Sequence, residues 1–273
     1  MIIFNALLRK HLLESRWMIG VSTAAFLALG VLTAWLTHRF EHFIEIGELT
    51  SSARRFGFLR ALGGPEMDYS TTALVVCWWN HPVIILTVLC WVISRAAAAV
   101  AGEIERGTID VTLSRPVSRW EYLSSQIVFA ALGLMVMVAA LASGSFIGRW
   151  IWTLKAPPGV LTMVKPWTML VTLGMAVFGY TLPFSTIDVV KWRPTLAAVV
   201  ITLGGLIAMS LAPQFDGYDW LESLSVFRAY APVTVTMKGD PLAYNGTVLM
   251  LVFAVGAGAS LWLFSMRDLP SNS

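Results

Sequence analysis

Long apolar runs alternate with short charged segments along this chain. Six runs carry few or no charged side chains, and they cover residues 17–37, 72–94, 127–147, 167–187, 194–211 and 243–265. An apolar helix of about 20 residues crosses the hydrocarbon core of a bilayer at 1.5 Å per residue. Backbone groups in lipid must satisfy one another's hydrogen bonds, so each run is predicted to be a helix. The pattern predicts an all-α polytopic integral membrane protein with six transmembrane helices in a single domain, residues 1–273.

The composition supports this class and excludes several others. Hydrophobic residues make up 57% of the chain and charged residues only 13%, whereas soluble domains carry about 25% charged residues. An ordinary water-soluble enzyme is therefore not expected. The net charge of +3 is too small for the strongly basic face of a nucleic-acid-binding protein, so no nucleic acid is expected as a partner. Both cysteines, Cys77 and Cys90, lie in one apolar run, which excludes a disulfide scaffold.

The tryptophans and the basic residues indicate how the chain sits in a membrane. Most of the 12 tryptophans flank apolar runs, which is typical of the aromatic belt at the membrane–water interface. An even number of spans places both termini on the same side. We expect both termini to be cytoplasmic, because the lysines and arginines are then denser in the inner segments.

Residues 1–16 form an amphipathic pattern ahead of the first run. Apolar side chains share one helical face and polar side chains share another, namely Phe4, Leu7, Leu8 and Leu12 against Asn5, Arg9 and Arg16. The pattern predicts a helix that lies in the membrane interface. A straight extension of the first transmembrane helix is the alternative.

The most charged part of the chain lies between the second and third runs. Glu103 and Arg106 are three residues apart, so they can pair on one helical face. Gly107 can end that helix by adopting a positive φ angle. Thr108 can then cap a second, short helix that runs to Ser114. Arg115 and Pro116 predict a turn, because proline disfavours helix at the residue before it.

The short helix and its exit carry two further patterns. Ile109 and Leu113 fall on one side of the helix and form a small apolar knob. Ser118 and Glu121 match a capping box at the start of the helix that becomes the third span. The segment is thus predicted to be a rigid elbow along the membrane surface, suited to docking into a groove on a cytoplasmic partner. An ordinary connecting loop is the alternative.

Several polar residues lie within or next to the apolar runs. Asn80 and His81 precede Pro82, which is expected to kink the second span. If the span begins near Thr72, these two residues lie in the outer half of the membrane and can line a pathway. If it begins later, they anchor the helix at the interface. Arg95 is expected to reach the inner headgroups from the end of the same span.

Two more pairings follow from spacing alone. Asp188 follows the fourth run and can pair with Lys191, three residues on. Gly144 and Gly148 form a G-x-x-x-G motif, which favours close packing of helices. That packing can lie within one subunit or at the seam of a dimer.

Three stretches resemble the ABC-type-2 exporter permease family. The first runs from Gly102-Glu103 through Gly107-Thr108 to the turn Leu113-Ser114-Arg115-Pro116-Val117-Ser118-Arg119. The second is Leu224-Ser225-Val226-Phe227 with Tyr230 after it, and the third is Phe264-Ser265-Met266-Arg267-Asp268-Leu269 at the end of the chain. The first stretch is similar to the signature loop of the family. With the six-run layout, the resemblance covers essentially the whole chain.

The resemblance implies a division of labour between chains. Two permease subunits, identical or paralogous, pair in the cytoplasmic membrane of a bacterium or archaeon. Each subunit rests on a cytoplasmic ABC ATPase, which binds ATP and Mg²⁺, and the short helix enters a cleft on that ATPase. The residues implied in this coupling are Glu103, Arg106, Gly107, Thr108, Ile109, Leu113, Arg115 and Pro116. Some members instead pass mechanical work to an extracytoplasmic partner.

Catalysis by this chain itself is not expected. The sequence contains no G-x-x-x-x-G-K-[ST] phosphate loop, so ATP hydrolysis belongs on another chain, and no cofactor is expected on this one. An intramembrane enzyme lacks a candidate acid–base set, and the scattered methionines suggest packing rather than a metal site. An ion-coupled secondary transporter is disfavoured because the runs have no mid-span carboxylate.

Overall fold

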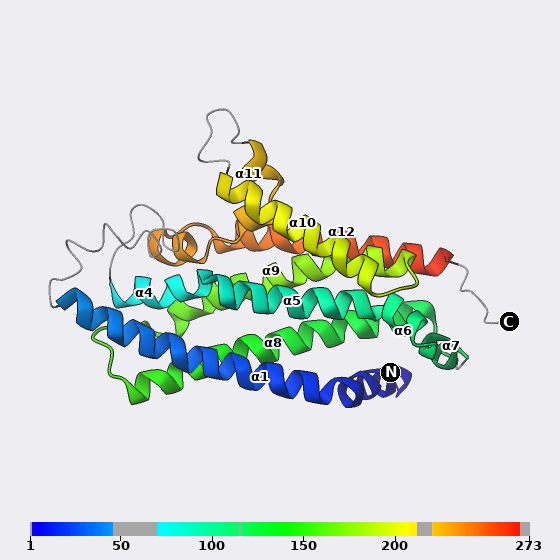
Figure 1. Cartoon of the computed structure of the whole chain (residues 1–273), viewed down its shortest axis with the longest axis horizontal. Helices are drawn as coiled ribbons and strands as arrows, with labels where there is room; N and C mark the ends of the chain where they lie inside the picture. Colours follow the sequence, from blue (N-terminus) through cyan, green and yellow to red (C-terminus); the bar gives the residue numbers. More distant parts are fainter. Residues whose placement is uncertain (1, 46–69, 115, 212–219, 268–273) are drawn as a thin grey trace.

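The computed structural model describes residues 2–45, 70–114, 116–211 and 220–267. Within these ranges the chain is helical and contains no strand. The long helices lie side by side in an elongated bundle (Figure 1). The described helices, in chain order, are α1 (Ile2–Glu45), α4 (Thr71–Cys77), the 3-10 helix η1 (Trp78–Asn80), α5 (Pro82–Ala99), α6 (Ala101–Glu105), α7 (Thr108–Leu113), α8 (Arg119–Ile151), α9 (Val160–Ile187), α10 (Trp192–Leu211), α11 (Trp220–Leu224), the 3-10 helix η3 (Val226–Ala229), the π-helix η4 (Thr234–Lys238) and α12 (Leu242–Met266).

Six helical segments in the described chain are long and apolar enough to cross a membrane. They are Phe4–His42, Thr71–Ala99, Arg119–Ile151, Val160–Ile187, Trp192–Met209 and Leu242–Met266. Five of them contain a predicted run completely, and Trp192–Met209 covers the run 194–211 up to residue 209, so the all-α architecture with six spans is confirmed. The helices extend beyond the apolar runs at most of their ends, because polar residues outside the hydrocarbon continue the backbone hydrogen bonding.

The separate interfacial helix predicted at the N-terminus is wrong. Helix α1 runs without a break from Ile2 to Glu45, so the amphipathic segment extends the first span. The face that carries Leu7 and His11 is buried against the rest of the chain. The amphipathic pattern thus reflects packing against protein on one side, which the sequence alone does not distinguish from packing against lipid.

Helices α1 and α8 pack closely through glycine. A side-chain carbon on Gly144 would lie 2.1 Å from the carbonyl oxygen of Leu27, and one on Gly148 would lie 2.4 Å from the Cβ atom of Ala34. Neither approach leaves room for a larger residue, which is the usual reason for small residues between membrane helices. The G-x-x-x-G motif is therefore used within the subunit.

Helix α9 contacts α5, α8, α10 and α12 and forms much of the core. Its side chains Leu170 and Phe178 are buried, as are Phe129 and Met137 of α8. In contrast, large apolar side chains cover the outer faces of α1, α10 and α12, and Trp17 of α1 is 77% exposed. Apolar residues directed away from a packed core are expected where the surrounding solvent is lipid.

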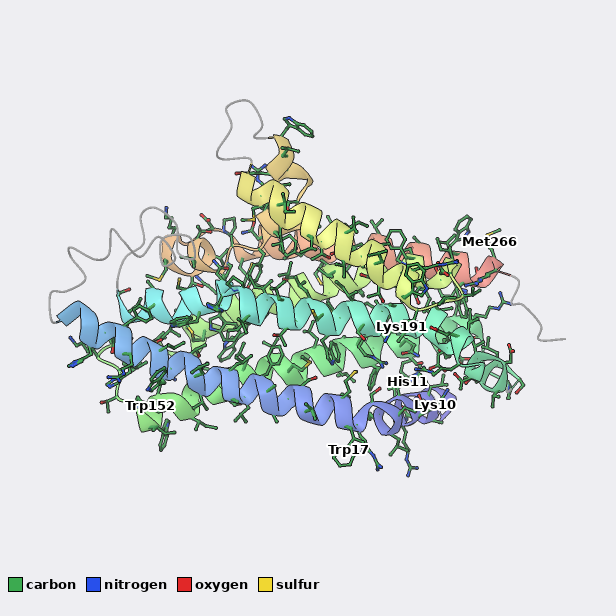
Figure 2. All side chains as sticks on the ribbon, in the orientation of Figure 1. Lys10, His11, Trp17, Trp152, Lys191 and Met266 are labelled. Carbon is green, nitrogen blue, oxygen red and sulfur yellow. The ribbon has the colours of Figure 1, made fainter. Side chains whose placement is uncertain are left out.

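The two ends of the bundle differ. One end holds α6, α7, the start of α1 and the end of α12, and it is called the elbow end from here on (Figure 1). The other holds α4 and the end of α1, and it is called the opposite end. Figure 2 places Lys10 and Lys191 toward the elbow end and Trp152 toward the opposite end.

Candidate functional site

The candidate site is the elbow, defined as residues 100–118 between α5 and α8. It begins with a break at Val100, whose φ and ψ angles of −124° and −59° interrupt the helix. The N–H groups of Val100 and Ala101 donate to Oγ of Ser185 in α9, at 3.2 and 3.1 Å. The Ser185 hydroxyl donates in turn to the Ala97 carbonyl at 2.9 Å. Buried backbone groups need partners, so this one serine stabilises the break.

A second side chain supports the same break from α8. The Tyr122 hydroxyl donates to the Ala99 carbonyl oxygen at 2.8 Å, and the ring is fully buried. Gln126 donates to the Tyr122 oxygen at 3.2 Å. The end of α5 is thereby held by both α8 and α9. Neither Ser185 nor Tyr122 was identified by sequence reasoning. Ser185 is a polar side chain inside an apolar run, whereas Tyr122 precedes one and gave no comparable signal.

Gly107 separates the two short helices as predicted. Its φ angle is +68°, in the left-handed region that glycine adopts without steric cost. The predicted cap by Thr108 is wrong, because Gly107 itself precedes α7 and makes no side-chain cap. Thr108 is instead the first residue of α7, and its hydroxyl donates to Oε2 of Glu103 at 2.7 Å. A charged carboxylate is a stronger acceptor for this hydroxyl than a neutral backbone carbonyl.

Glu103 is the centre of the elbow. The residue is 3% exposed, and its carboxylate binds Thr108, forms an ion pair with Arg106 and lies 3.6 Å from Nζ of Lys10. The predicted pairing of Glu103 with Arg106 is therefore observed. Burial by itself raises the pKa of the Glu103 carboxyl, but the Thr108 hydrogen bond and the charges of Lys10 and Arg106 outweigh it. The pKa consequently lies below its ordinary value of 4.5, and the group is ionised at neutral pH.

Lys10 joins the elbow to the start of α1. Its Nζ atom donates to Oγ1 of Thr112 in α7 at 2.9 Å, in addition to its contact with Glu103. The lysine therefore bridges both short helices of the elbow. Sequence reasoning missed this role, because Lys10 and Thr112 lie 102 positions apart in the chain.

The outer surface of α7 differs from the predicted knob. Ile109 is 3% exposed and Leu113 packs against the core, so the apolar face formed by these two residues anchors α7 to its own bundle. The exposed apolar side chain is Val111, at 63%, and it lies between exposed Asp110 and Ser114. Pro116 is exposed as well, whereas Arg115 lies outside the described residues.

The exit from the elbow is joined to the end of the chain. Ser118 and Glu121 form the predicted capping box. Arg119, which directly follows Ser118, donates through Nη1 to the carbonyl oxygens of Phe264 and Ser265 at 3.0 and 3.3 Å. The last carbonyls of a helix have no partner within it, so Arg119 caps α12 from the elbow.

Arg267 makes a similar connection one helix further on. Its Nη1 atom donates to the carbonyls of Thr186 and Asp188 at 2.6 and 2.9 Å, at the end of α9. Two of the stretches singled out in the sequence are therefore neighbours in space. The guanidinium groups of Arg119 and Arg267 link the elbow to α12, and α12 to α9.

Two further sequence predictions about this end of the molecule are wrong. Arg95 points into the bundle rather than to headgroups, and it donates to Oγ of Ser15 and Oε1 of Gln126 at 3.1 and 3.3 Å. Instead of pairing with Lys191, Asp188 forms an ion pair with Arg193, with 3.7 Å between Oδ1 of Asp188 and Nη1 of Arg193. Lys191 donates to Oγ of Ser94 at 3.2 Å. In each case the partner belongs to another helix or to a turn whose shape the local spacing does not reveal.

Asn80 and His81 lie at the far end of α5 from the elbow and do not contribute to it. The predicted break occurs here, since η1 ends at Asn80 and α5 begins at Pro82. His81 is the N-cap of α5, and its Nδ1 atom accepts the N–H of Val83 at 3.3 Å. The imidazole therefore has a structural role in capping the helix.

The second stretch of the resemblance, near Ser225, lies between α10 and α12. The Ser225 hydroxyl donates to the Gly205 carbonyl in α10 at 2.9 Å and accepts the N–H of Phe227 at 3.2 Å. Phe227 is buried in the core. The stretch thus joins the end of α10 to the bundle.

Among the described residues, no group of three His, Cys, Asp or Glu side chains is arranged to hold a metal ion.

Six helices that are long and apolar enough to cross a membrane, with an elbow of short helices between the second and third, define a polytopic membrane protein. A comparison with protein families is more specific. The model of the family described as ABC-2 family transporter protein matches residues 9–269. The chain belongs to this family and is a membrane component of an ABC transporter. Neither a curated protein nor a solved structure matched the chain.

Proposed function

We propose that this chain is the membrane-spanning subunit of an ABC exporter, and that its elbow couples ATP hydrolysis on a separate cytoplasmic ATPase to substrate movement. The observation that carries the proposal is the buried network of Glu103, which ties α6 and α7 to each other and to α1. A short helix fixed in this way transmits a displacement to the bundle instead of absorbing it.

The elbow residues divide into three roles in this proposal. Glu103, Arg106 and Thr108 hold the two short helices together. Ile109 and Leu113 anchor α7 to the bundle, and Gly107 and Pro116 shape the turns. Val111 is the apolar contact offered to the ATPase, because it is the exposed apolar residue of α7.

A push on the elbow would reach several spans. Ser185 and Tyr122 connect the break at Val100 to α9 and α8. Arg119 connects the elbow exit to α12. Docking of the ATPase on α7 would therefore act on α5, α8, α9 and α12. A second permease subunit, identical or paralogous, would complete the translocation path.

We further infer the orientation of the chain. The start of α1 and the end of α12 lie at the elbow end (Figure 1). If the elbow meets a cytoplasmic ATPase, both termini are cytoplasmic, and the protein is a multi-pass protein of a bacterial or archaeal cytoplasmic membrane. ATP and Mg²⁺ would then be bound by the ATPase, with no cofactor on this chain.

Affinity purification of the tagged chain from its native membrane tests the proposal. We expect a stoichiometric ABC ATPase to be recovered with the wild-type chain and lost with Val111→Asp. Val189→Asp is the matched control, since Val189 is exposed between α9 and α10. Recovery of the ATPase with both variants would show that α7 is not the docking helix, and its absence from the wild type would overturn the subunit assignment.

A further inference from the structure

A groove runs along the surface of the bundle between α8 and α9. It is lined by six residues of α8 between Met135 and Phe146 and by Trp167 and Val171 of α9, and its volume is about 330 Å³. Two of the lining residues, Ala139 and Ala142, are small. Apart from the hydroxyl of Ser143 and the indole nitrogen of Trp167, the lining side chains carry no polar atom.

The length of the groove matches one leaflet of a bilayer. Met135 and Phe146 are separated by about 16 Å along α8 at 1.5 Å per residue. The hydrocarbon core of a bilayer is about 30 Å thick, so one leaflet is about half of that. The groove extends toward the opposite end of the bundle, where Trp150 is 90% exposed. Exposed tryptophan is typical of the headgroup level.

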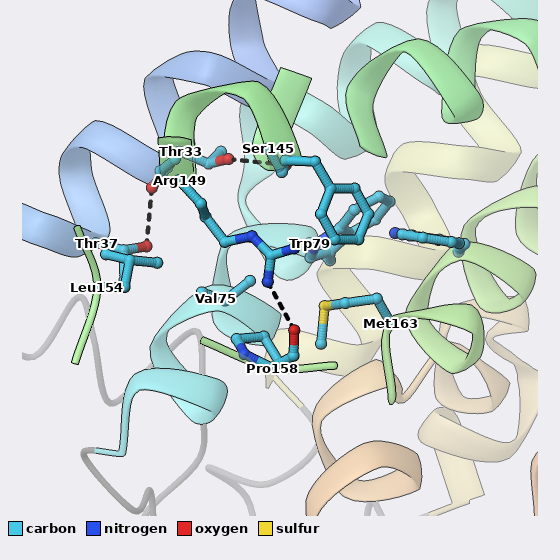
Figure 3. Close-up of a pocket in the computed structure, with 12 residues that line it drawn as sticks. Thr33, Thr37, Val75, Trp79, Ser145, Arg149, Leu154, Pro158 and Met163 are labelled. Carbon is cyan, nitrogen blue, oxygen red and sulfur yellow. Dashed lines mark hydrogen bonds between the residues drawn. The ribbon is translucent and has the colours of Figure 1, made fainter. Parts of the chain in front are cut away.

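Arg149 lies in α8 about one helical turn beyond Phe146, the last residue of α8 that lines the groove, and it also lines a smaller neighbouring cavity. Its guanidinium stacks on the Phe146 ring, 4.0 Å from the centroid. Nη1 donates to the Pro158 carbonyl at 2.6 Å, as the dashed line in Figure 3 shows. Within the described residues no carboxylate forms an ion pair with Arg149. A cation next to hydrocarbon is costly unless it is paired, and a guanidinium is well suited to bind phosphate oxygens.

We propose that this groove and Arg149 form a binding site for one anionic phospholipid of the surrounding bilayer. One acyl chain lies in the groove from Met135 to Phe146, and the phosphate pairs with the Arg149 guanidinium. The site is separate from the elbow and does not depend on the coupling role proposed above. It would make the packing of α8 against α9 sensitive to lipid composition.

The enclosed cavity behind Arg149 does not take part in lipid binding. This cavity also borders Thr37 and Trp79, and its volume is about 20 Å³. Such a volume holds about one water molecule. The indole nitrogen of Trp167 is buried without a hydrogen-bond partner among the described residues, and it borders the same cavity. A water molecule fits this cavity, whereas an acyl chain does not.

Lipid titration of the purified, delipidated full-length chain tests the proposal. Native mass spectrometry would measure binding of phosphatidylglycerol and phosphatidylcholine of equal chain length. We expect phosphatidylglycerol to bind more tightly to the wild type, and Arg149→Gln to weaken its binding about fivefold, the typical contribution of one basic residue. Arg39→Gln is the matched control, because Arg39 stacks on Trp35 and is exposed at the same end of the bundle. Equal binding of both lipids by the wild type, or equal losses in both variants, would overturn the site.

A second pair of variants tests the groove itself. Ala139→Trp fills the groove from an exposed position and should abolish the preference for phosphatidylglycerol, whereas Ala254→Trp on the exposed face of α12 should not. Retention of the preference in Ala139→Trp would exclude the groove as the acyl-chain site. Ser143→Cys tests whether a second subunit, rather than a lipid, covers the groove. Efficient disulfide cross-linking between two copies in membranes would show that a second subunit covers it and would overturn the proposal.

Discussion

The Tyr230 hydroxyl donates a 2.6 Å hydrogen bond to the backbone carbonyl of Trp79, inside the second span. This carbonyl lacks its normal helical partner, because the N–H of Val83 is bound to the His81 side chain. Proline at 82 cannot supply an N–H either. Burial raises the pKa of Tyr230, so the phenol keeps its proton and remains a donor at physiological pH. A residue from the segment before α12 thus stabilises the break between η1 and α5.

Tyr230→Phe should lower the thermal stability of the protein. The variant keeps the buried ring but leaves the Trp79 carbonyl without a partner, at a cost of about 1 to 3 kcal/mol. Tyr244→Phe is the matched control, since Tyr244 is 68% exposed. The melting temperatures of both variants are measured by thermal unfolding in detergent, with tryptophan fluorescence as the signal. Equal melting temperatures for the two variants would show that the Tyr230 hydrogen bond contributes nothing to stability.

Glu103→Gln should uncouple the transporter while leaving membrane insertion intact. The change removes the charge that holds Lys10 and Arg106, so the elbow loosens and more ATP is hydrolysed for each substrate moved. Glu105→Gln is the control: Glu105 is exposed, and its accepted hydrogen bond from the Lys191 N–H survives in glutamine. The ratio of ATP hydrolysed to substrate moved is obtained from the ATPase and transport rates in proteoliposomes that also contain the partner ATPase. An unchanged ratio in Glu103→Gln would argue against a coupling role for this carboxylate.

The elbow should open in acid through Glu103. A carboxyl whose folded pKa lies below 4.5 stabilises the fold fully above pH 4.5, and that contribution is lost as the pH falls through the folded value. Hydrogen exchange of the amides of residues 101–113, scaled for intrinsic rate, should therefore accelerate below pH 4.5. Glu103→Gln should remove this acid dependence. If the variant and the wild type respond identically to pH, another group controls the opening.

Ser185→Ala should destabilise the elbow more than an equivalent change elsewhere. It leaves two buried N–H groups, of Val100 and Ala101, without an acceptor, at about 1 to 3 kcal/mol each. Ser260→Ala is the control, because the buried Ser260 hydroxyl donates to the Gly256 carbonyl, an acceptor within its own helix. Ser185→Thr keeps the hydroxyl, so this variant should retain the stability and coupling of the wild type. Limited proteolysis at the elbow and the ATP-to-substrate ratio report the effect, and equal behaviour of the two alanine variants would contradict it.

Local features of this protein follow from its sequence because each depends on a few neighbouring residues. The apolar runs are long enough to require membrane-spanning helices whatever their partners are. Gly107 adopts a positive φ angle, Pro82 interrupts a helix, and Ser118 with Glu121 forms a capping box. The pairing of Glu103 with Arg106 also needs only one helical turn. The number of spans and the breaks at Pro82 and Gly107 could therefore be predicted, whereas the break at Val100 was not.

Only the tertiary structure decides which polar groups meet and which faces are buried. Lys10 and Thr112 lie 102 positions apart, Ser185 and Val100 lie 85 apart, and Tyr230 and Trp79 lie 151 apart. Each contact depends on which helices pack together and on how they are positioned relative to each other along their axes. The same holds for the apolar face of α7, which local periodicity identified but whose direction, toward the bundle, was set by the position of the neighbouring helices. Apolar residues satisfy lipid and protein equally well, so periodicity alone cannot distinguish a docking surface from a buried one.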